Sequence, residues 1–323
     1  MAKISVLTPV YNEEATVLAC YEEVRQVFAG MGGGHTYEHI FGDNRSKDRT
    51  LEILKDLAAR DPNVKILAYS RNFGAEKSSL TLMRHATGDA CVWVMADTQE
   101  PPTLIPRMVE EWEAGHEIVV GVYTNRSDGI LMRAGRSLYY RLVRWVSNQE
   151  LDRDFSGFAL LDRCVMEEIA AVDDFNPYIR GLVSTLGFNK IMIPYERRPR
   201  QAGESKHHFS FLMDFGLNAV ISYSILPIRL ATFVGCILSG LSILMSLVYA
   251  IIKITHWNFQ APGATTTIVL VLFFSGIQLL FLGVLGEYIG AIHSQVRRKP
   301  FIVIRERVNF PAEDRDAAVR HSV

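Results

Sequence analysis

The sequence predicts an α/β protein with a mostly parallel sheet and helices on both faces, followed by a helical membrane segment. Three observations lead to this prediction. Strand-like apolar runs alternate with amphipathic helical stretches over roughly the first 200 residues, polar residues follow each of the first four apolar runs, and two long uncharged runs lie near the C-terminus. Alternation of this kind is typical of parallel sheets, because each parallel connection needs a crossover that is usually a helix.

The predicted elements follow one another in short steps. Apolar runs rich in β-branched and aromatic residues predict five strands, at residues 4–10, 37–42, 64–69, 90–95 and 118–122. Apolar residues at helical spacing predict the helices between them, at residues 12–28, 48–60, 76–86 and 103–114. Ligands of such sheets bind beside the carboxyl ends of the strands. The loops after the first four strands therefore form the candidate site.

Composition narrows the classes of function. The chain has 323 residues, of which 49% are hydrophobic and 21% charged, and its formal net charge is −1. This near-neutral balance argues against a nucleic acid as the partner, because proteins of that class rely on a basic surface. The four cysteines show no paired spacing, which indicates neither a zinc site nor a disulfide framework. The N-terminal apolar run is too short for the pattern of a signal peptide.

The two uncharged runs predict a transmembrane hairpin, with helices at about residues 230–252 and 266–288. A helix needs about 20 apolar residues to cross the hydrocarbon core of a bilayer. The other interpretation is a pair of buried core helices, which seldom lack a polar face at this length. The preceding segment, residues 208–227, is apolar but carries Asp214 and Asn218, and we expect it to lie in the membrane interface.

Positive charges flank this hairpin, and few lie between its helices. The intervening loop holds Lys253 and His256, whereas the flanks hold Arg197, Arg198, Arg200, Lys206 and Arg229 on one side and Arg297, Arg298 and Lys299 on the other. The positive-inside rule then places both ends in the cytoplasm. We therefore expect a cytoplasmic α/β domain at residues 1–207, the interfacial segment at 208–227, the hairpin at 228–292 and a cytoplasmic tail at 293–323.

Each of the first four predicted strands ends in polar residues, at positions 8–14, 42–48, 70–74 and 96–102. The first strand is not followed by Gly-x-Gly-x-x-Gly, and the chain has no P-loop pattern, so a phosphate ligand would need a divalent cation and cationic side chains. A carboxylate such as that of Asp97 suits Mg²⁺ or Mn²⁺, which prefer oxygen ligands. Further on, basic residues surround Gly203, and these either bind phosphate or contact anionic lipid headgroups.

Seven segments, in this order and spacing, carry a family resemblance: TPVYNEE, DNRSKDRT, SRNFGAEKSSLT, ADTQEPP, GFALLDR, RPRQAGESK and LGEYIGAI. Together with the two apolar runs, they make the chain resemble the polyprenyl-phosphate glycosyltransferases of glycosyltransferase family 2, the group of bactoprenol-phosphate glucosyltransferases and dolichol-phosphate mannose synthases. The resemblance implies a GT-A fold. It also implies transfer, with inversion, of a sugar from a nucleotide sugar, UDP-glucose or a related UDP-hexose, to polyprenyl (undecaprenyl) phosphate.

The same resemblance implies a location and single-residue roles. The protein would be a multi-pass protein of the bacterial inner membrane, with its catalytic domain facing the cytoplasm and a product used for cell-envelope glycan or lipopolysaccharide modification. The implied nucleotide-sugar-binding residues are Pro9, Tyr11, Glu13, Asp43, Arg71, Asn72 and Asp97, of which Asp43 reads the uracil ring. The implied ligands of Mg²⁺ or Mn²⁺ are Asp97 and Gln99, with Glu100 beside them. The implied catalytic residues are Asp97, Asp154, Arg200 and Lys206, the last two holding phosphates.

Three motifs depart from the family pattern. Met95 replaces the first acid of Asp-x-Asp, and Asn44 and Arg45 replace Asp-Gly in Asp-Asp-Gly-Ser. Gly157 replaces the acid of Gly-Asp-Phe-Arg-Leu, which is often taken as the catalytic base, and Asp154 lies three residues upstream as its substitute. A base is not essential, because a phosphate monoester nucleophile has a second pKa of about 6 and is largely dianionic at neutral pH.

Two other functions fit parts of the sequence. A processive polysaccharide synthase would need more membrane helices and a Gln-x-x-Arg-Trp motif. A catalytically degenerate member acting as a scaffold would explain the altered acids, although the chain retains Asp43, Asp97, Arg200 and Lys206. The sequence leaves open which sugar is transferred, how long the carrier lipid is and whether the chain forms a homo-oligomer.

Overall fold

The computed structural model describes residues 1–32, 34–124, 155–172, 174, 177–198, 226–255, 263–296 and 301–311. The chain forms two compact units. The first comprises Met1–Arg136, Glu150–Lys206 and Arg298–Val323, and the second comprises Ser137–Gln149 and His207–Arg297. The loops of the candidate site all belong to the first unit.

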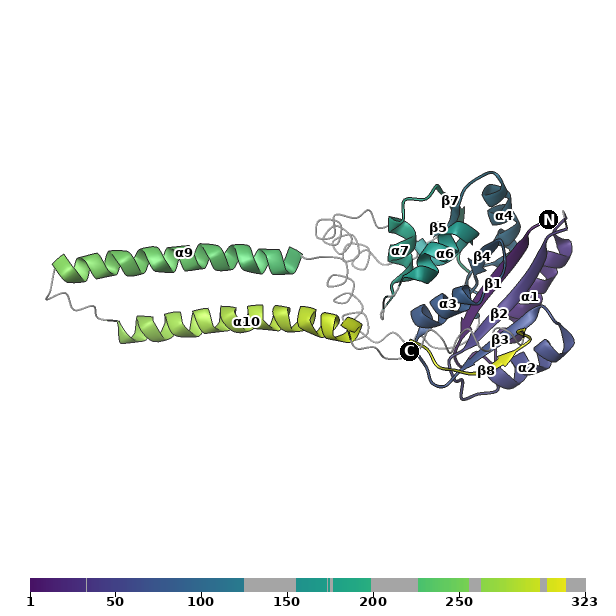
Figure 1. The fold of residues 1–323 in the computed structure, drawn as a ribbon, viewed down its shortest axis with the longest axis horizontal. Helices are drawn as coiled ribbons and strands as arrows, with labels where there is room; N and C mark the ends of the chain where they lie inside the picture. The colour runs from purple at the N-terminus through teal and green to yellow at the C-terminus, as the bar shows by residue number, and fades with distance from the viewer. Residues whose placement is uncertain are drawn as a thin grey trace. The chain divides into compact units, whose positions relative to one another are not determined.

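The first unit contains an eight-stranded sheet with the strand order β7-β5-β6-β4-β1-β2-β3-β8 (Figure 1). Its strands are β1 (Lys3–Val10), β2 (Thr36–Asp43), β3 (Val64–Tyr69), β4 (Ala90–Trp93), β5 (Ile118–Tyr123), β6 (Phe155–Asp162), β7 (Lys190–Tyr195) and β8 (Ile304–Val308). β1 pairs in parallel with β2 and β4, β2 with β3, and β5 with β7, while β6 and β8 run antiparallel to their neighbours. The mostly parallel sheet predicted from the sequence is confirmed.

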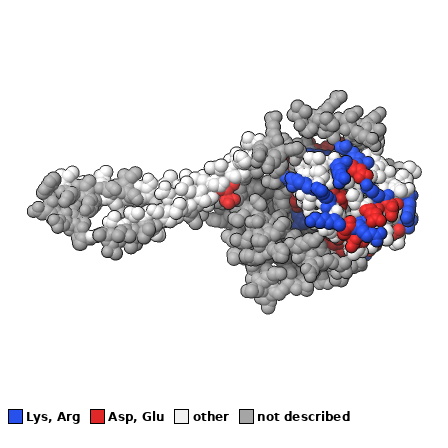
Figure 2. All heavy atoms as spheres, turned by 90° about the horizontal axis from the view of Figure 1, so that it is seen from below, with Lys and Arg blue, Asp and Glu red and all other residues white. Residues whose placement is uncertain are grey.

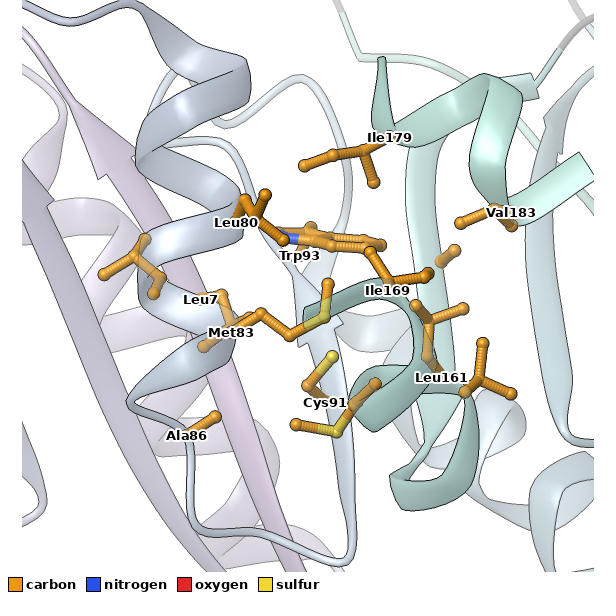
Figure 3. Packing of buried hydrophobic residues seen from close by; sticks show 14 of the residues in the cluster. Leu7, Leu80, Met83, Ala86, Cys91, Trp93, Leu161, Ile169, Ile179 and Val183 are labelled. Atoms are coloured by element: carbon orange, nitrogen blue, oxygen red, sulfur yellow. The ribbon is translucent and has the colours of Figure 1, made fainter. Parts of the chain in front are cut away.

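Helices cover both faces of this sheet, as predicted. They are α1 (Val17–Gly30), α2 (Thr50–Arg60), α3 (Ala75–Arg84), the 3₁₀ turn η1 (Pro102–Leu104), α4 (Ile105–Glu113), α6 (Arg163–Ala171) and α7 (Ile179–Thr185). On one face, Leu80 of α3, Ile169 of α6 and Val183 of α7 share a core with Leu7 and Trp93 of the sheet (Figure 3). α1, α2 and α4 contribute to the two cores on the other face. The sheet is thus buried on both sides, which is why its strands read as continuous apolar runs.

The first helix begins later than the sequence predicts. The predicted helix at 12–28 starts only at Val17. The residues before it form a loop, because the backbone N–H of Glu13 donates to Thr50 Oγ1 at 2.8 Å and Asn12 adopts a left-handed φ of 56°. Contacts with a distant part of the chain therefore override the local helical signal.

β8 is a strand that the sequence analysis does not predict. It adds to the sheet antiparallel to β3, beyond the last parallel strand on that side. Asn309, just after it, donates from Nδ2 to the backbone oxygens of Ala58 and Val64, both at 2.8 Å. The segment that follows the second long helix therefore completes one edge of the sheet. The domain limits drawn from the sequence, with a tail at 293–323, stay predictions.

A buried ion cluster joins the three strands β1, β2 and β3 away from the candidate site. Glu38 is 1% exposed, and its Oε2 lies 2.7 Å from Lys65 Nζ and 2.9 Å from Lys3 Nζ. Ser5 Oγ and the backbone N–H of Thr87 donate to Oε1 at 2.6 and 2.7 Å. Burial by itself would raise the pKa of this carboxyl group, but these donors lower it to about 2. Glu38 is therefore ionised, and its ion pairs link β2 to β1 and β3.

The second unit contains two long helices, α9 (Leu226–Thr255) and α10 (Ala264–Val296). In Figure 2 their described atoms are almost entirely white, whereas Lys, Arg, Asp and Glu gather on the first unit. Large apolar side chains are exposed along both, for example Met245 at 73% and Leu279 at 69%. Apolar surface on this scale needs a partner, either lipid or another protein surface.

The two predicted spans lie within these helices. Among the described residues, one stretch, Phe273–Gly290 in α10, is long and apolar enough to cross a bilayer, and the apolar stretch of α9, Ala231–Leu241, is shorter. The helices are thus present, and a hairpin that crosses the membrane twice stays a prediction. Residues 208–225 of the predicted interfacial segment lie outside the described residues.

Candidate active site

The loops after β1 and β2 are held together by hydrogen bonds. The backbone N–H of Asn12 donates to Ser46 Oγ at 3.0 Å, and the backbone N–H of Lys47 donates to Asn12 Oδ1 at 2.8 Å. Because β1 and β2 are adjacent and parallel, their carboxyl ends lie at the same edge of the sheet. Tyr11 and Asp43 therefore meet at one edge.

Asp43, the last residue of β2, is a buried carboxylate with a fixed position. It is 1% exposed, and the backbone N–H of Ser46 donates to its two oxygens at 3.1 and 3.4 Å. Burial raises its pKa, and the hydrogen bonds from Ser46 oppose this rise. Gly42 precedes it for a steric reason, because a Cβ there would lie 2.7 Å from both Ser78 Oγ and Tyr69 Oη. The backbone before Asp43 can thus approach α3 closely.

The residues that depart from the second family motif hold the loop after β3. Arg45 stands where the pattern has glycine and adopts a left-handed φ of 58°, and its Nη1 donates to the backbone oxygen of Ser70 at 2.8 Å. Asn44 Oδ1 accepts from the backbone N–H of Phe73 at 3.2 Å. The guanidinium of Arg71 lies 4.1 Å from the centre of the Phe73 ring. The altered motif therefore organises the loop that carries Arg71.

Left-handed backbone conformations gather in the loops of this edge. Asn12 follows β1 with a φ of 56°, Arg45 follows β2 with 58°, and Thr98 follows β4 with 56°. A non-glycine residue in this region costs roughly 1–3 kcal/mol, and such residues concentrate at functional sites. Three of the four non-glycine residues with a positive φ in the described part of the chain thus lie in these loops, and the fourth, Asn309, follows β8.

The loop after β4 contacts the segment that follows β7. β4 ends two residues earlier than the predicted strand. In this loop the backbone N–H of Gln99 donates to Asp97 Oδ1 at 3.2 Å, and Gln99 Oε1 accepts a hydrogen bond from Arg197. The backbone N–H of Arg198 donates to the Gln99 backbone oxygen at 3.1 Å, and its guanidinium pairs with Glu23 of α1 at 2.8 Å. Two arginines before the predicted phosphate-binding pair thus reach the Asp97 loop.

Glu100 is a buried acid that the sequence analysis places beside the implied metal ligands Asp97 and Gln99. It is 4% exposed, and its Oε2 has no hydrogen-bond partner among the described residues. Burial, together with the charge of Asp97, raises its pKa to about 8, against the opposing charges of Arg180 and Arg197. A buried oxygen without a partner is costly unless a ligand satisfies it.

The donor set of this loop fits a divalent cation. Asp97 and Glu100 offer carboxylate oxygens and Gln99 an amide oxygen, which are the ligand types that Mg²⁺ and Mn²⁺ prefer. Within the part of the chain that the structure describes, no group of three or more His, Cys, Asp or Glu side chains could hold a metal by itself. A cation at Asp97 would therefore share its coordination with a ligand or with water.

Residue 157, an acid in the family pattern, is glycine in this chain and lies against an arginine side chain. Gly157 in β6 has a left-handed φ of 99°, and a Cβ on it would lie 3.2 Å from Nε of Arg180. Arg180 comes from α7. An arginine side chain therefore lies against residue 157, and the proposed substitute acid, Asp154, lies outside the described residues.

The structure places most predicted site residues along the edge formed by the ends of β4, β1, β2 and β3. These residues are Pro9, Tyr11, Glu13, Asp43, Arg71, Asn72, Asp97 and Gln99. Burial raises the pKa of Cys20 in α1 to about 12, and the charges of Glu23, Asp97 and Glu13 add to this rise. Because Glu13 follows β1 and Asp97 follows β4, both loops lie close to Cys20 and hence to each other. Arg200 and Lys206 lie outside the described residues. Sequence reasoning missed Arg180, because no motif links α7 to β6.

Known proteins resemble the chain over nearly its whole length. Residues 5–169 match the family model described as Glycosyl transferase family 2. The chain is 35% identical to the Bacillus subtilis (strain 168) protein named uncharacterized glycosyltransferase YkcC, over 94% of this chain and 93% of that protein. It is 34% identical to the bactoprenol glucosyl transferase of Shigella phage SfX, over 94% of this chain and 99% of that protein. A solved structure of glucosyl-3-phosphoglycerate synthase from Mycobacterium tuberculosis, in complex with Mn²⁺, UDP and glucosyl-3-phosphoglycerate, aligns with a TM-score of 0.46 and 16% identity, over 68% of this chain and 78% of that one. The chain belongs to glycosyl transferase family 2.

Proposed function

We propose that this glycosyltransferase moves a sugar from UDP-glucose or a related UDP-hexose to polyprenyl (undecaprenyl) phosphate. The observation that carries the proposal is the similarity to a bactoprenol glucosyl transferase over 94% of this chain. Coverage on that scale includes most of α9 and α10 as well as the α/β unit. Both the nucleotide-sugar domain and the long apolar helices are thus shared with a protein named for its lipid carrier.

The edge of β1, β2 and β3 suits the nucleotide. Asp43 presents a buried carboxylate, which acts only as an acceptor when ionised and so suits the ring N–H of uracil. Arg71 and Asn72, at the end of β3, are exposed beside it and offer donors to the ribose or the base. Donor selectivity for uridine would then rest on one buried acid in a fixed backbone.

The loop after β4 suits the diphosphate. Asp97, Gln99 and Glu100 would hold Mg²⁺ or Mn²⁺, which supplies charge that stabilises the departing diphosphate. Arg197, hydrogen-bonded to Gln99, adds a positive charge beside these residues. The family resemblance implies that Arg200 and Lys206 would make the remaining phosphate contacts.

The chemistry needs no protein base. A phosphate oxygen of the acceptor forms the new bond to the anomeric carbon, on the face opposite the bond that breaks. The electron pair of the broken bond leaves with the nucleoside diphosphate. Because the acceptor is already largely dianionic at neutral pH, no proton has to be removed, and Gly157 in place of the acid is compatible with turnover. The rate enhancement then comes from the positioning of the two substrates and from neutralisation of the charge on the departing diphosphate.

The acceptor dictates where the enzyme works. A polyprenyl chain stays in the bilayer and presents its phosphate at the surface, so α9 and α10 would cross the membrane and segment 208–227 would lie along it. The excess of Lys and Arg outside the hairpin favours a catalytic unit on the cytoplasmic side of a bacterial inner membrane. The product would serve envelope glycan or lipopolysaccharide modification.

A donor screen tests the proposal. Purified full-length protein in detergent would be incubated with undecaprenyl phosphate, Mn²⁺ and one radiolabelled donor at a time: UDP-glucose, UDP-galactose, UDP-N-acetylglucosamine or GDP-mannose. We expect label in the lipid fraction with a UDP-hexose and none without the lipid phosphate. Label in a long water-soluble polymer would indicate a polysaccharide synthase. No transfer from any donor, by protein that still binds UDP, would indicate a scaffold and overturn the proposal.

A further inference from the structure

Arg180 occupies space that exists because residue 157 is glycine. It is the second residue of α7, and its Nε would lie 3.2 Å from a Cβ placed on Gly157. Such a contact is tighter than nearly all real Cβ contacts, and the φ of 99° at Gly157 is itself one that L side chains rarely adopt. A side chain at residue 157 would therefore force the guanidinium to shift by a few tenths of an ångström, whereas glycine leaves it in place.

The backbone that carries Arg180 is firmly held. Its neighbour Ile179 and the later Val183 belong to the same core as Trp93 of β4 (Figure 3). The backbone N–H of Ile179 also donates to Glu76 Oε2 of α3 at 3.1 Å. α7 is thus fixed to both β4 and α3 at the end that carries Arg180.

Two acids lie near Arg180 without pairing with it directly. Burial raises the pKa of both Glu76 and Glu100, and the charge of Arg180 opposes the rise in each case. Within the described residues, the guanidinium makes no hydrogen bond or ion pair with either carboxyl group, and Glu100 Oε2 has no partner. β6 runs antiparallel to β4 with Val92 opposite Leu160, so Gly157 and the Arg180 side chain against it lie toward the carboxyl end of β4, where the loop with Asp97 begins. None of the five N–H donors of Arg180 has a hydrogen-bond acceptor within the part of the chain that the structure describes, so they can serve a ligand.

On the basis of the proposed function, we propose that Arg180 is a phosphate-binding residue of this active site and that glycine at residue 157 leaves space for its guanidinium. A guanidinium presents paired N–H donors that match phosphate oxygens in geometry and charge. A carboxylate at residue 157 would instead repel a dianionic phosphate. The proposed reaction brings two such groups to the site, the phosphate of the acceptor and the diphosphate of the donor.

Separate measurements of the two substrates test this inference. Arg180→Ala and Arg180→Lys would be prepared as full-length proteins in detergent. The Kd of UDP with Mn²⁺ would be measured by calorimetry, and the KM of undecaprenyl phosphate at saturating donor. We expect Arg180→Ala to raise at least one of them about tenfold or more, the scale of one lost charge-assisted contact, and Arg180→Lys to restore part of the loss. A rise in KM alone identifies the acceptor phosphate, and a rise in the Kd of UDP identifies the donor.

A matched control separates binding from structural support. Arg25→Ala removes an exposed arginine that pairs with Glu22 at 2.8 Å, and it should leave both constants unchanged. If Arg180 only balances the buried acids, Arg180→Ala will lower the Tm while both constants stay at the wild-type values, and the inference is overturned. Should Arg180→Ala fail to fold, Arg180→Gln removes the charge while keeping a polar side chain, and unchanged constants in that folded variant would also overturn the inference.

Substitutions at residue 157 test the same inference from the other side. Gly157→Asp places an acid against Arg180 and should raise the constant that Arg180→Ala raises by about tenfold or more. Gly157→Ala imposes the same backbone strain without a charge, so a clearly smaller effect is expected there. Equal effects of the two substitutions would count against a role for the charge of Arg180. If the wild type transfers no sugar, the proposed function fails, and calorimetry with UDP and with undecaprenyl phosphate still decides whether Arg180 binds phosphate.

Discussion

Replacing Glu38 by glutamine should destabilise the α/β unit by a predictable amount. Glu38 is 1% exposed and ties β2 to Lys3 and Lys65, and its pKa falls from an ordinary value of 4.5 to about 2 in the folded protein. A shift of this size corresponds to about 3 kcal/mol of stability at neutral pH. That figure agrees with the cost of about 3–5 kcal/mol for removing one partner of a buried ion pair.

The pH dependence gives this prediction its sign. Because the folded-state pKa is lowered, the contribution of Glu38 is fully present above about pH 4.5 and is lost as the pH falls toward 2. The difference in stability between the wild type and Glu38→Gln should therefore be largest at pH 7. It should shrink below pH 4.5, where the carboxyl group of the unfolded chain becomes protonated, and be lost near pH 2, where the folded carboxyl group is also protonated and neutral like the glutamine.

Thermal unfolding of the full-length protein in detergent, followed by near-ultraviolet circular dichroism, measures the effect. For a unit of this size, about 3 kcal/mol corresponds to a Tm lowered by about 6–12 °C. Glu22→Gln is the matched control: Glu22 forms an exposed pair with Arg25, and such pairs contribute about 0–1 kcal/mol. A Glu38→Gln variant as stable as the wild type at pH 7, or a Tm difference that does not change between pH 7 and pH 3, would refute the reasoning.

Three further predictions concern catalysis and topology. Asp97→Asn should lower turnover about a hundredfold or more and weaken Mn²⁺ binding measured by electron paramagnetic resonance, because a charged ligand becomes neutral; undiminished activity of the wild type in excess EDTA would contradict a metal at Asp97. Lys206→Ala should lower transfer about tenfold or more in neutral detergent, and near-normal rates there would mean that Lys206 only contacts lipid headgroups. In whole cells, an impermeant thiol reagent should label a cysteine introduced at Asn258 but not one introduced at Ala318, and the reverse pattern would invert the proposed topology.

Local patterns in the sequence were sufficient for the fold class. The strands β1 to β4 are visible in the sequence as apolar runs, because both of their faces are buried. The helices between them are visible as amphipathic stretches, because each buries only one side. The same patterns located the loops of the candidate site, since parallel strands deliver their carboxyl ends to one edge. Asp43 and Asp97 could therefore be placed at this edge without coordinates.

Contacts between distant segments were beyond the reach of these patterns. Residues 12–16 carry a helical signal, yet the bond between Glu13 and Thr50 keeps them in a loop. β8 is short and charged, and it becomes a strand because β3 offers an unpaired edge and Asn309 anchors to neighbouring backbone oxygens. In each case the deciding energy comes from a hydrogen bond to a residue far away in the chain.

The sequence by itself determined the family, the α/β fold class and the edge of the sheet at which the site lies, because these follow from periodicity and from short motifs. Only the tertiary structure decided what faces what at that edge. Met95 and Gly157 read as lost acids, but the structure adds a buried Glu100, whose Oε2 has no hydrogen-bond partner among the described residues, and an Arg180 against Gly157. The physical reason is that the electrostatic potential of the site depends on residues from the loop after β4, from β6 and from α7. A local sequence pattern does not show which of these residues lie next to one another.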